Sequence, residues 1–190
     1  QTMDEAAFLK ETEDHMKKSE EYMIHEFAAV RTGKASPALV EGIDVHVAAY
    51  GSSMKLKQLA MITAPEPRLL LIQPFDPSTT RDIERGIRES KLGINPSVDG
   101  KSIRLPIPEL SEERRRDLAK MCKGMAEDAR VRIRGHRRDA LDSVKKAQKA
   151  GEITEDDLHR FDKEVQTLTD KYVKDIDAHM VKKEEEIMKV

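Results

Sequence analysis

The spacing of apolar residues predicts three long helices and, between the first and the second, a segment of a different kind. The predicted helices cover residues 4–31, residues 111–150, and the chain from Thr154 almost to its end. Each has one narrow apolar stripe at intervals of three, four or seven residues, which suits packing against partner helices. Helices this polar are marginal alone, so we expect the three to form an antiparallel or near-antiparallel bundle.

Local signals set the ends of these helices. Ser111 precedes two glutamates and is a good N-cap, and Gly151 is the expected stop of the second helix. Thr154 and Asp157 have the spacing of a capping box, which should begin the third helix.

The segment between the first two helices has a β-like pattern. Ile43, Val45 and Val47 alternate with polar residues, and residues 69–72 form a short apolar run typical of a buried strand. Asp76 followed by proline predicts the start of a short helix, and residues 102–105 are predicted to form another strand. The prolines at 65 and 67 indicate a break, and residues 95–100 are predicted to form a loop. The fold class is therefore α+β, with a bundle from residues 1–31 and 106–190 and an inserted β/α/β domain at 32–105.

The chain crosses between these two predicted domains twice, and both crossings contain proline. Two short crossings permit rotation without sliding, so we expect a hinge. The predicted hinge residues are Arg31, Thr32, Gly33, Lys34, Ala35, Ser36, Pro37, Leu105, Pro106, Ile107 and Pro108.

Charge adds a candidate function for the second long helix. Between residues 114 and 138 it has ten Lys or Arg against three Asp or Glu, in a chain whose net charge is −2. At about 100° per residue, its basic side chains gather on a third of the circumference, as a row about 40 Å long. Such a row suits a phosphate backbone. The candidate RNA-binding residues are Arg116, Lys120, Lys123, Arg130, Arg134, Arg137 and Arg138.

Two observations temper that interpretation. A charged row is also the ordinary solvated face of a long helix, and Glu127 lies within the same sector. The alternative function is a helical coiled-coil adaptor that binds another protein through its apolar stripes or acidic faces.

The sequence favours a binding protein over an enzyme. The six histidines lack the spacing of a helical metal site, and Cys122 lies on the predicted packing face. Residues 95–102 superficially suggest a phosphate loop, but a strand and not a helix follows them. We therefore expect no catalytic residue, no metal and no cofactor. With one cysteine, no signal-peptide pattern before or after Met3, and no apolar run of 18 residues, we expect a cytoplasmic monomer without a membrane partner.

Several runs in this chain resemble the ribosome recycling factor family. They extend over essentially the whole sequence in order: VRTGKASP at 30–37, LGINP at 92–96, IRLPIP at 103–108, LSEERR at 110–115, AR at 129–130 with Arg134 and RRD at 137–139, and ITEDD at 153–157. Each run alone is weak, and together they are highly specific. One position departs, because Gly135 stands where the family commonly has Asn; it could loosen the helix or let the backbone approach RNA.

The resemblance implies an L-shaped two-domain protein that binds the bacterial 70S ribosome after termination, on the large subunit. Elongation factor G, which carries the GTP, would then drive the subunits apart and release mRNA and tRNA. The factor itself would hydrolyse nothing. In the family, the arginines corresponding to Arg130, Arg134, Arg137 and Arg138 contact large-subunit rRNA, and all four belong to the basic row.

Overall fold

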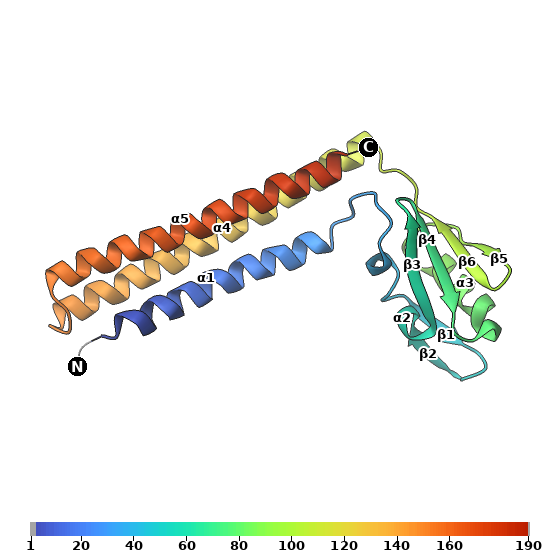
Figure 1. Cartoon of the computed structure of the whole chain (residues 1–190), viewed down its shortest axis with the longest axis horizontal. Helices are drawn as coiled ribbons and strands as arrows, with labels where there is room; N and C mark the ends of the chain where they lie inside the picture. The colour runs from blue at the N-terminus through green and yellow to red at the C-terminus, as the bar shows by residue number, and fades with distance from the viewer. Residues whose placement is uncertain (1–2, 190) are drawn as a thin grey trace. The chain divides into compact units, whose positions relative to one another are not determined.

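The computed structural model describes residues 3–189, which form two compact units (Figure 1). The larger unit contains the described residues up to 31 together with 112–189, and the smaller contains residues 32–111. Gln1 and Thr2 lie outside the described residues. The chain thus combines helix and sheet, with a long helical region and a small β/α/β domain, as the sequence predicted.

The larger unit is a bundle of three helices, α1 (Glu5–Ala28), α4 (Glu112–Lys149) and α5 (Glu155–Met188). Two contacts along each pair of helices fix the directions. Glu5 and then Glu13 of α1 pair with Arg160 and then Lys171 of α5, in the same order along both helices. Ser19 and then Tyr22 of α1 contact His136 and then Arg132 of α4, in the reverse order. α1 therefore runs parallel to α5 and antiparallel to α4.

The helix ends follow the local signals in the sequence. Asp4 caps α1 by accepting a hydrogen bond from the backbone N–H of Ala7 at 3.3 Å. Gly151 takes the left-handed conformation after α4, with φ of 77°. The capping box is formed as predicted, because Thr154 and Asp157 exchange side-chain-to-backbone bonds of 3.0 and 3.1 Å.

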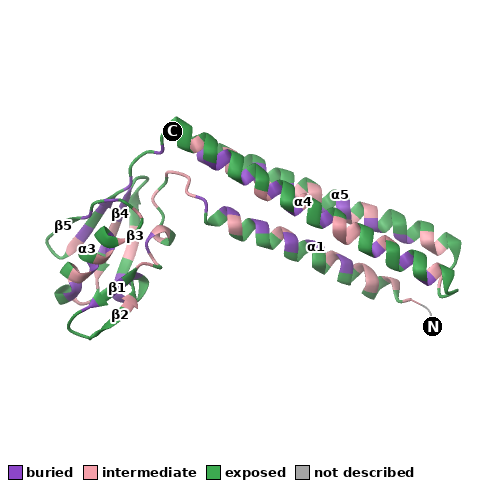
Figure 2. Ribbon diagram, turned by 180° about the vertical axis from the view of Figure 1, so that it is seen from behind, coloured by how far each residue is buried: buried purple, intermediate pink, exposed green. Residues whose placement is uncertain are grey.

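Buried positions recur along all three helices where the apolar stripes predicted them (Figure 2). Met16 and Met23 are fully enclosed, as are Ile133, Phe161 and Ile176. Three polar residues lie within the same seam: Thr12, Ser19 and Thr169. Because helices this polar are unstable in isolation, burial in this shared seam is what stabilises them.

The smaller unit is built on a four-stranded antiparallel sheet with strand order β3-β4-β6-β5 and a separate hairpin of β1 and β2. Two helices accompany them, and fourteen apolar side chains form one core. The bounds are β1 Asp44–Val47, β2 Ser52–Lys55, α2 Leu56–Leu59, β3 Ala60–Glu66, β4 Leu69–Pro74, α3 Thr80–Glu89, β5 Ser97–Asp99 and β6 Ser102–Pro106, with short 3-10 turns at Pro37–Leu39 and Pro77–Thr79.

The sequence did not predict β2, α2, β3 or β5 of this unit. The break expected at residues 64–67 is confirmed only in part: Pro67 begins the turn to β4, but Pro65 lies inside β3. A proline is tolerated there since β3 is an edge strand and its pairing is irregular between Thr63 and Glu66. The loop expected at residues 95–100 contains β5, which pairs with β6 as a hairpin that turns at Gly100.

The second predicted crossing is shorter than expected. Pro106 still pairs with Leu69 in the sheet, and the N–H of Ile107 donates to the carbonyl of Arg68 at 2.8 Å. Ile107 is 2% exposed. The predicted boundary before residue 106 therefore differs from the observed one after residue 111, because these residues continue an edge of the core. In the first crossing, the N–H of Ala35 donates to the carbonyl of Pro67 at 2.7 Å.

Candidate nucleic-acid interface

The predicted basic row lies on α4, on the side that adjoins α5. α4 is unbroken over 38 residues, and its buried positions face the seam. The basic side chains begin beside that seam and extend to the open face. The side chains of Arg116, Lys123 and Arg134 are 70%, 61% and 55% exposed to solvent, but that of Arg130 is only 21% exposed.

Acidic residues of the bundle pair with part of this row. Arg130 donates to Asp177 of α5 at 2.8 Å and to Glu127 at 3.0 Å. Arg134 lies 3.8 Å from the other oxygen of Glu127, and Lys123 lies 3.6 Å from Glu184 of α5. Near the start of α4, Arg116 pairs with Glu112, one turn before it. Four residues of the row are thus paired with carboxylates of the bundle.

Arg130 is the most strongly held cation of the row. Partial burial works to lower its pKa, but the hydrogen bonds and charges of Asp177 and Glu127 outweigh burial, and the pKa is raised. Three guanidinium nitrogens contact two carboxylates, so Arg130 ties α4 to α5. Because the other pairs are exposed, each contributes about 0–1 kcal/mol and is screened by salt.

Lys120, Arg137 and Arg138 form no ion pair with any residue that the structure describes. Lys120 and Arg138 are exposed, and Arg137 is half-buried with its Nε enclosed and without a hydrogen-bond partner in the described chain. Two neighbouring cations without an ion pair among the described residues therefore lie at positions 137 and 138. There the row can contact a phosphate without first losing an internal partner.

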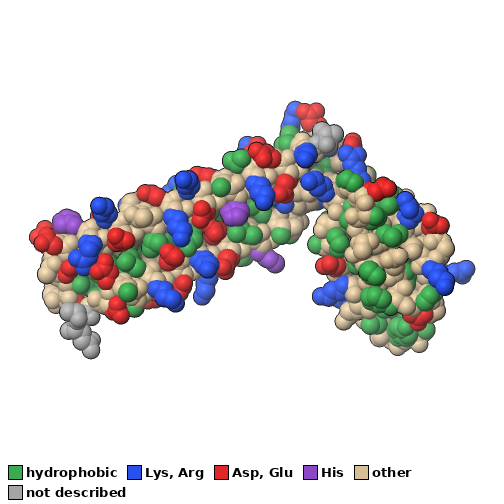
Figure 3. Space-filling view, in the orientation of Figure 1, with side chains coloured by type: hydrophobic (Ala, Val, Ile, Leu, Met, Phe, Trp, Pro, Cys, Tyr) green, Lys and Arg blue, Asp and Glu red, His purple; other side chains and the backbone are tan. Residues whose placement is uncertain are grey.

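The helices of the bundle divide its charge unequally. α4 has thirteen Lys or Arg against seven Asp or Glu, whereas α5 has six against eleven. The face in Figure 3, on which α1 and α5 lie in front, shows basic and acidic side chains interspersed along the bundle. Positive charge is therefore concentrated on one helix and does not cover the bundle.

Gly135 does not interrupt α4. A Cβ at this position would approach only the guanidinium of Arg138, at 3.7 Å. The structure therefore shows room for a side chain, and a local loosening of the helix at Gly135 is not observed.

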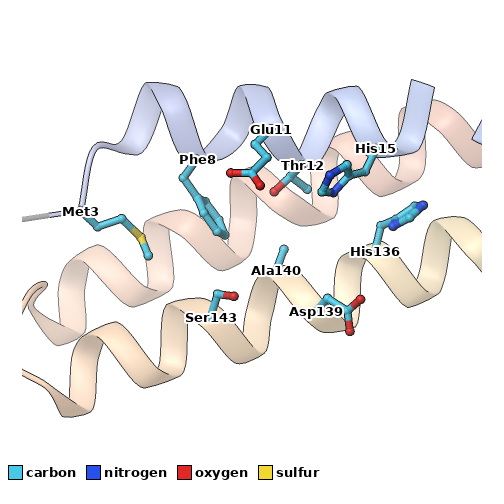
Figure 4. A pocket seen from close by; sticks show the side chains of 9 residues that line it. All are labelled: Met3, Phe8, Glu11, Thr12, His15, His136, Asp139, Ala140 and Ser143. Atoms are coloured by element: carbon cyan, nitrogen blue, oxygen red, sulfur yellow. The ribbon is translucent and has the colours of Figure 1, made fainter. Parts of the chain in front are cut away.

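A pocket of about 280 Å³ lies between α1 and α4 (Figure 4). Its polar wall includes His15 from α1 and His136 from α4, whose ring centroids are 5.6 Å apart. Burial, and then the charge of His15, lower the pKa of His136. The hydroxyl of Ser19 hydrogen-bonds to Nε2 of His136 at 2.9 Å and links the two helices. His136 lies at the boundary of the core and is half-buried.

Other chemistry is sparse over residues 3–189. They contain no group of three or more metal-ligating side chains that could hold an ion. No helix in this range is long and apolar enough to cross a membrane. Cys122 is fully buried, and burial raises the pKa of its thiol, consistent with its predicted packing role.

Sequence reasoning identified the basic residues but not their partners. Glu127 was noted as an interruption of the row, and its contact with Arg130 follows from the three-residue spacing. Asp177 and Glu184 could be found only by knowing how α5 is aligned against α4, which the apolar stripes do not specify to one residue.

The fold and this surface define a class: a long three-helix bundle with a basic row on one helix, joined to a small α/β unit. The family model of the ribosome recycling factor matches residues 23–188. The chain belongs to the ribosome recycling factor family.

The chain matches known relatives and solved structures along essentially its whole length. The chain is 57% identical to the ribosome-recycling factor of Akkermansia muciniphila over 188 residues, covering 99% of this chain and all of that one. It is 50% identical to the factor of Rubrobacter xylanophilus with the same coverage. A solution structure of a ribosome recycling factor matches with a TM-score of 0.74 at 42% identity, covering both chains completely.

A second solved structure gives a functional context. It contains models for the T. thermophilus ribosome recycling factor and the E. coli elongation factor G bound to the E. coli post-termination complex. It matches with a TM-score of 0.63 at 42% identity and covers 98% of this chain and all of that one.

Proposed function

We propose that this protein is a ribosome recycling factor that binds the post-termination ribosome through the basic row of α4, on rRNA of the large subunit. The row supports this proposal because it concentrates positive charge on one helix while the neighbouring helix is acidic. Phosphate contacts position a protein on RNA without reading its sequence. The proposed rRNA-binding residues are Arg116, Lys120, Lys123, Arg130, Arg134, Arg137 and Arg138.

The basic residues of the row have different proposed roles. Arg134, Arg138 and Lys120 are exposed and contact phosphates directly. Arg130 is held by Asp177 and Glu127 and positions the surface. This division follows from burial and pairing. Arg130 is 21% exposed and has two carboxylate partners, so it gains less from a phosphate than an exposed side chain with one weak pair or none.

The proposed partner is elongation factor G with its bound GTP, which a relative of this chain accompanies on a post-termination complex. We propose that this partner acts on the docked factor so that the ribosomal subunits separate and mRNA and tRNA are released. The protein acts as a cytoplasmic monomer and contributes no catalytic group; the only hydrolysis is that of the partner's GTP.

The proposed hinge lies in the two crossings between the compact units, which meet after Arg31 and before Glu112. In the first crossing it includes Thr32, Gly33 and Lys34, before the bond from Ala35 to Pro67. In the second crossing Glu109 pairs with Arg68 and Leu110 is buried, so the proposed hinge lies close to the start of α4. Gly33, with φ of 84°, gives the first crossing a conformation that other residues disfavour.

A subunit-splitting assay tests this proposal. Light scattering of post-termination ribosomes is followed with this protein alone, with elongation factor G and GTP alone, and with all three. We expect rapid splitting only in the complete mixture. Equal splitting without this protein, or splitting by it without elongation factor G, would reject the proposed role.

A further inference from the structure

Glu127 occupies an unusual place in the basic row. It lies on α4 within the basic sector, and its two carboxylate oxygens contact different arginines. Oε2 accepts from Nη1 of Arg130 at 3.0 Å, and Oε1 lies 3.8 Å from Nη1 of Arg134. A phosphate bridging these arginines would present two oxygens in the same manner.

The pairs around Glu127 neutralise the middle of the row. Arg130 and Arg134 supply two positive charges, and Glu127 and Asp177 supply two negative charges. On either side, Lys120 and Arg138 have no ion-pair partner among residues 3–189. The central part of the surface is thus occupied by the protein's own carboxylates while the flanking parts are open to RNA.

We propose that Glu127 is an internal competitor of RNA: its carboxylate occupies the phosphate position between Arg130 and Arg134 and lowers the affinity of the row for RNA in general. This inference rests on the proposed RNA-binding role of α4. Glu127 is a positioning residue, since it acts through the two arginines and does not contact RNA itself.

The contact is weak enough to be displaced. The side chain of Glu127 is 57% exposed, and exposed pairs are easily exchanged for other partners. Asp177 continues to hold Arg130 from α5 when Glu127 leaves, so the exchange does not disturb the packing of α4 against α5. RNA therefore gains Arg134 at the cost of the two ion pairs that Glu127 forms with Arg130 and Arg134.

The test compares Glu127→Gln with Asp128→Asn. Both variants remove one negative charge from neighbouring exposed positions of α4, but Asp128 forms no ion pair with a described residue. The net charge, and with it long-range attraction to RNA, changes equally. Only Glu127→Gln releases Arg134, so any difference between the variants reports the local competition.

The probe is a single-stranded uridine oligomer, titrated with each full-length protein over a range of salt concentrations. We expect Glu127→Gln to bind about threefold more tightly than Asp128→Asn, in line with the strength of one exposed pair. Its salt dependence should be steeper by about 0.7 for one additional phosphate contact. Far-UV circular dichroism checks that helix content is unchanged.

Equal affinity and equal salt dependence of the two variants would overturn the proposal. Binding of the unaltered protein to isolated large ribosomal subunits is measured in parallel and tests the proposed function separately. If the subunits are bound but Glu127→Gln matches Asp128→Asn, only the competitor role is wrong. If Arg134→Ala abolishes the advantage of Glu127→Gln, the released arginine is the cause; a persisting advantage would contradict the mechanism.

Discussion

Replacing Arg134 and Arg138 together by alanine tests the basic row with little cost to folding. Both side chains are exposed; Arg134 has one weak pair at 3.8 Å, and Arg138 has none with a described residue. Exposed substitutions of this kind change the free energy of unfolding by about 0.5 kcal/mol or less. Arg137 is unsuitable for this purpose, because its Nε is enclosed and its replacement would also disturb packing.

The effect on binding follows from the two lost contacts. A hydrogen bond to a charged group contributes about 1.5 kcal/mol at the low end, so two contribute about 3 kcal/mol, or about 150-fold in affinity for the large subunit. The slope of log affinity against log salt should become shallower by about 1.4–1.8 for two phosphates. The assay is sedimentation of the protein with isolated large subunits at several salt concentrations.

The matched control replaces Lys163 and Lys174 by alanine, which removes the same charge from exposed positions of α5. We expect the control to bind nearly as the unaltered protein does. If both double variants lose affinity equally, net charge and not the α4 surface governs binding, and the assignment of the row is refuted.

Three further predictions concern stability and the hinge. The pKa of His136 is lower in the folded protein, so on acidification the unfolded chain takes up a proton at this position first. The free energy of unfolding should therefore fall as the pH drops below about 6.5. His136→Gln should flatten this pH dependence, which urea titrations at several pH values measure. Phe161→Ala should lower the free energy of unfolding by about 3–5 kcal/mol, because Phe161 is 1% exposed and packs on Phe8; a loss below 1 kcal/mol in urea unfolding would contradict the packing. Gly33→Ala should slow subunit splitting but spare large-subunit binding, because an L-residue disfavours φ of 84° by about 1 kcal/mol; unchanged splitting would discard the hinge.

The long helices could be predicted because each signal for them is local. Asp157 lies three residues from Thr154, and the apolar stripes repeat within one or two turns, so the sequence contains both caps and packing faces. The edge strand β3 could not be predicted in the same way. Pro65 is a strand breaker by its own chemistry, and only the position of β3 at the edge of the sheet makes it acceptable.

In the candidate site, too, local features could be predicted and contacts between helices could not. The angular grouping of the basic residues follows from helical geometry and is present in α4. The partners of Arg130 and Lys123 come from α5, more than forty residues further along the chain. Their contacts depend on the alignment of two packed helices, which local spacing does not determine. Similarly, the N–H of Ile107 donates to the carbonyl of Arg68, so the sheet holds part of the second predicted crossing, whose prolines suggested a free segment.

Site-specific cross-linking on the post-termination ribosome measures most directly which surface of the bundle meets RNA. A photo-reactive group is attached through Arg138→Cys on the row of α4, or through Lys163→Cys on α5, and the buried Cys122 does not compete for the reagent. We predict strong cross-links to large-subunit rRNA from position 138 and few from position 163. Equal yields, or a higher yield from position 163, would contradict docking through the basic row.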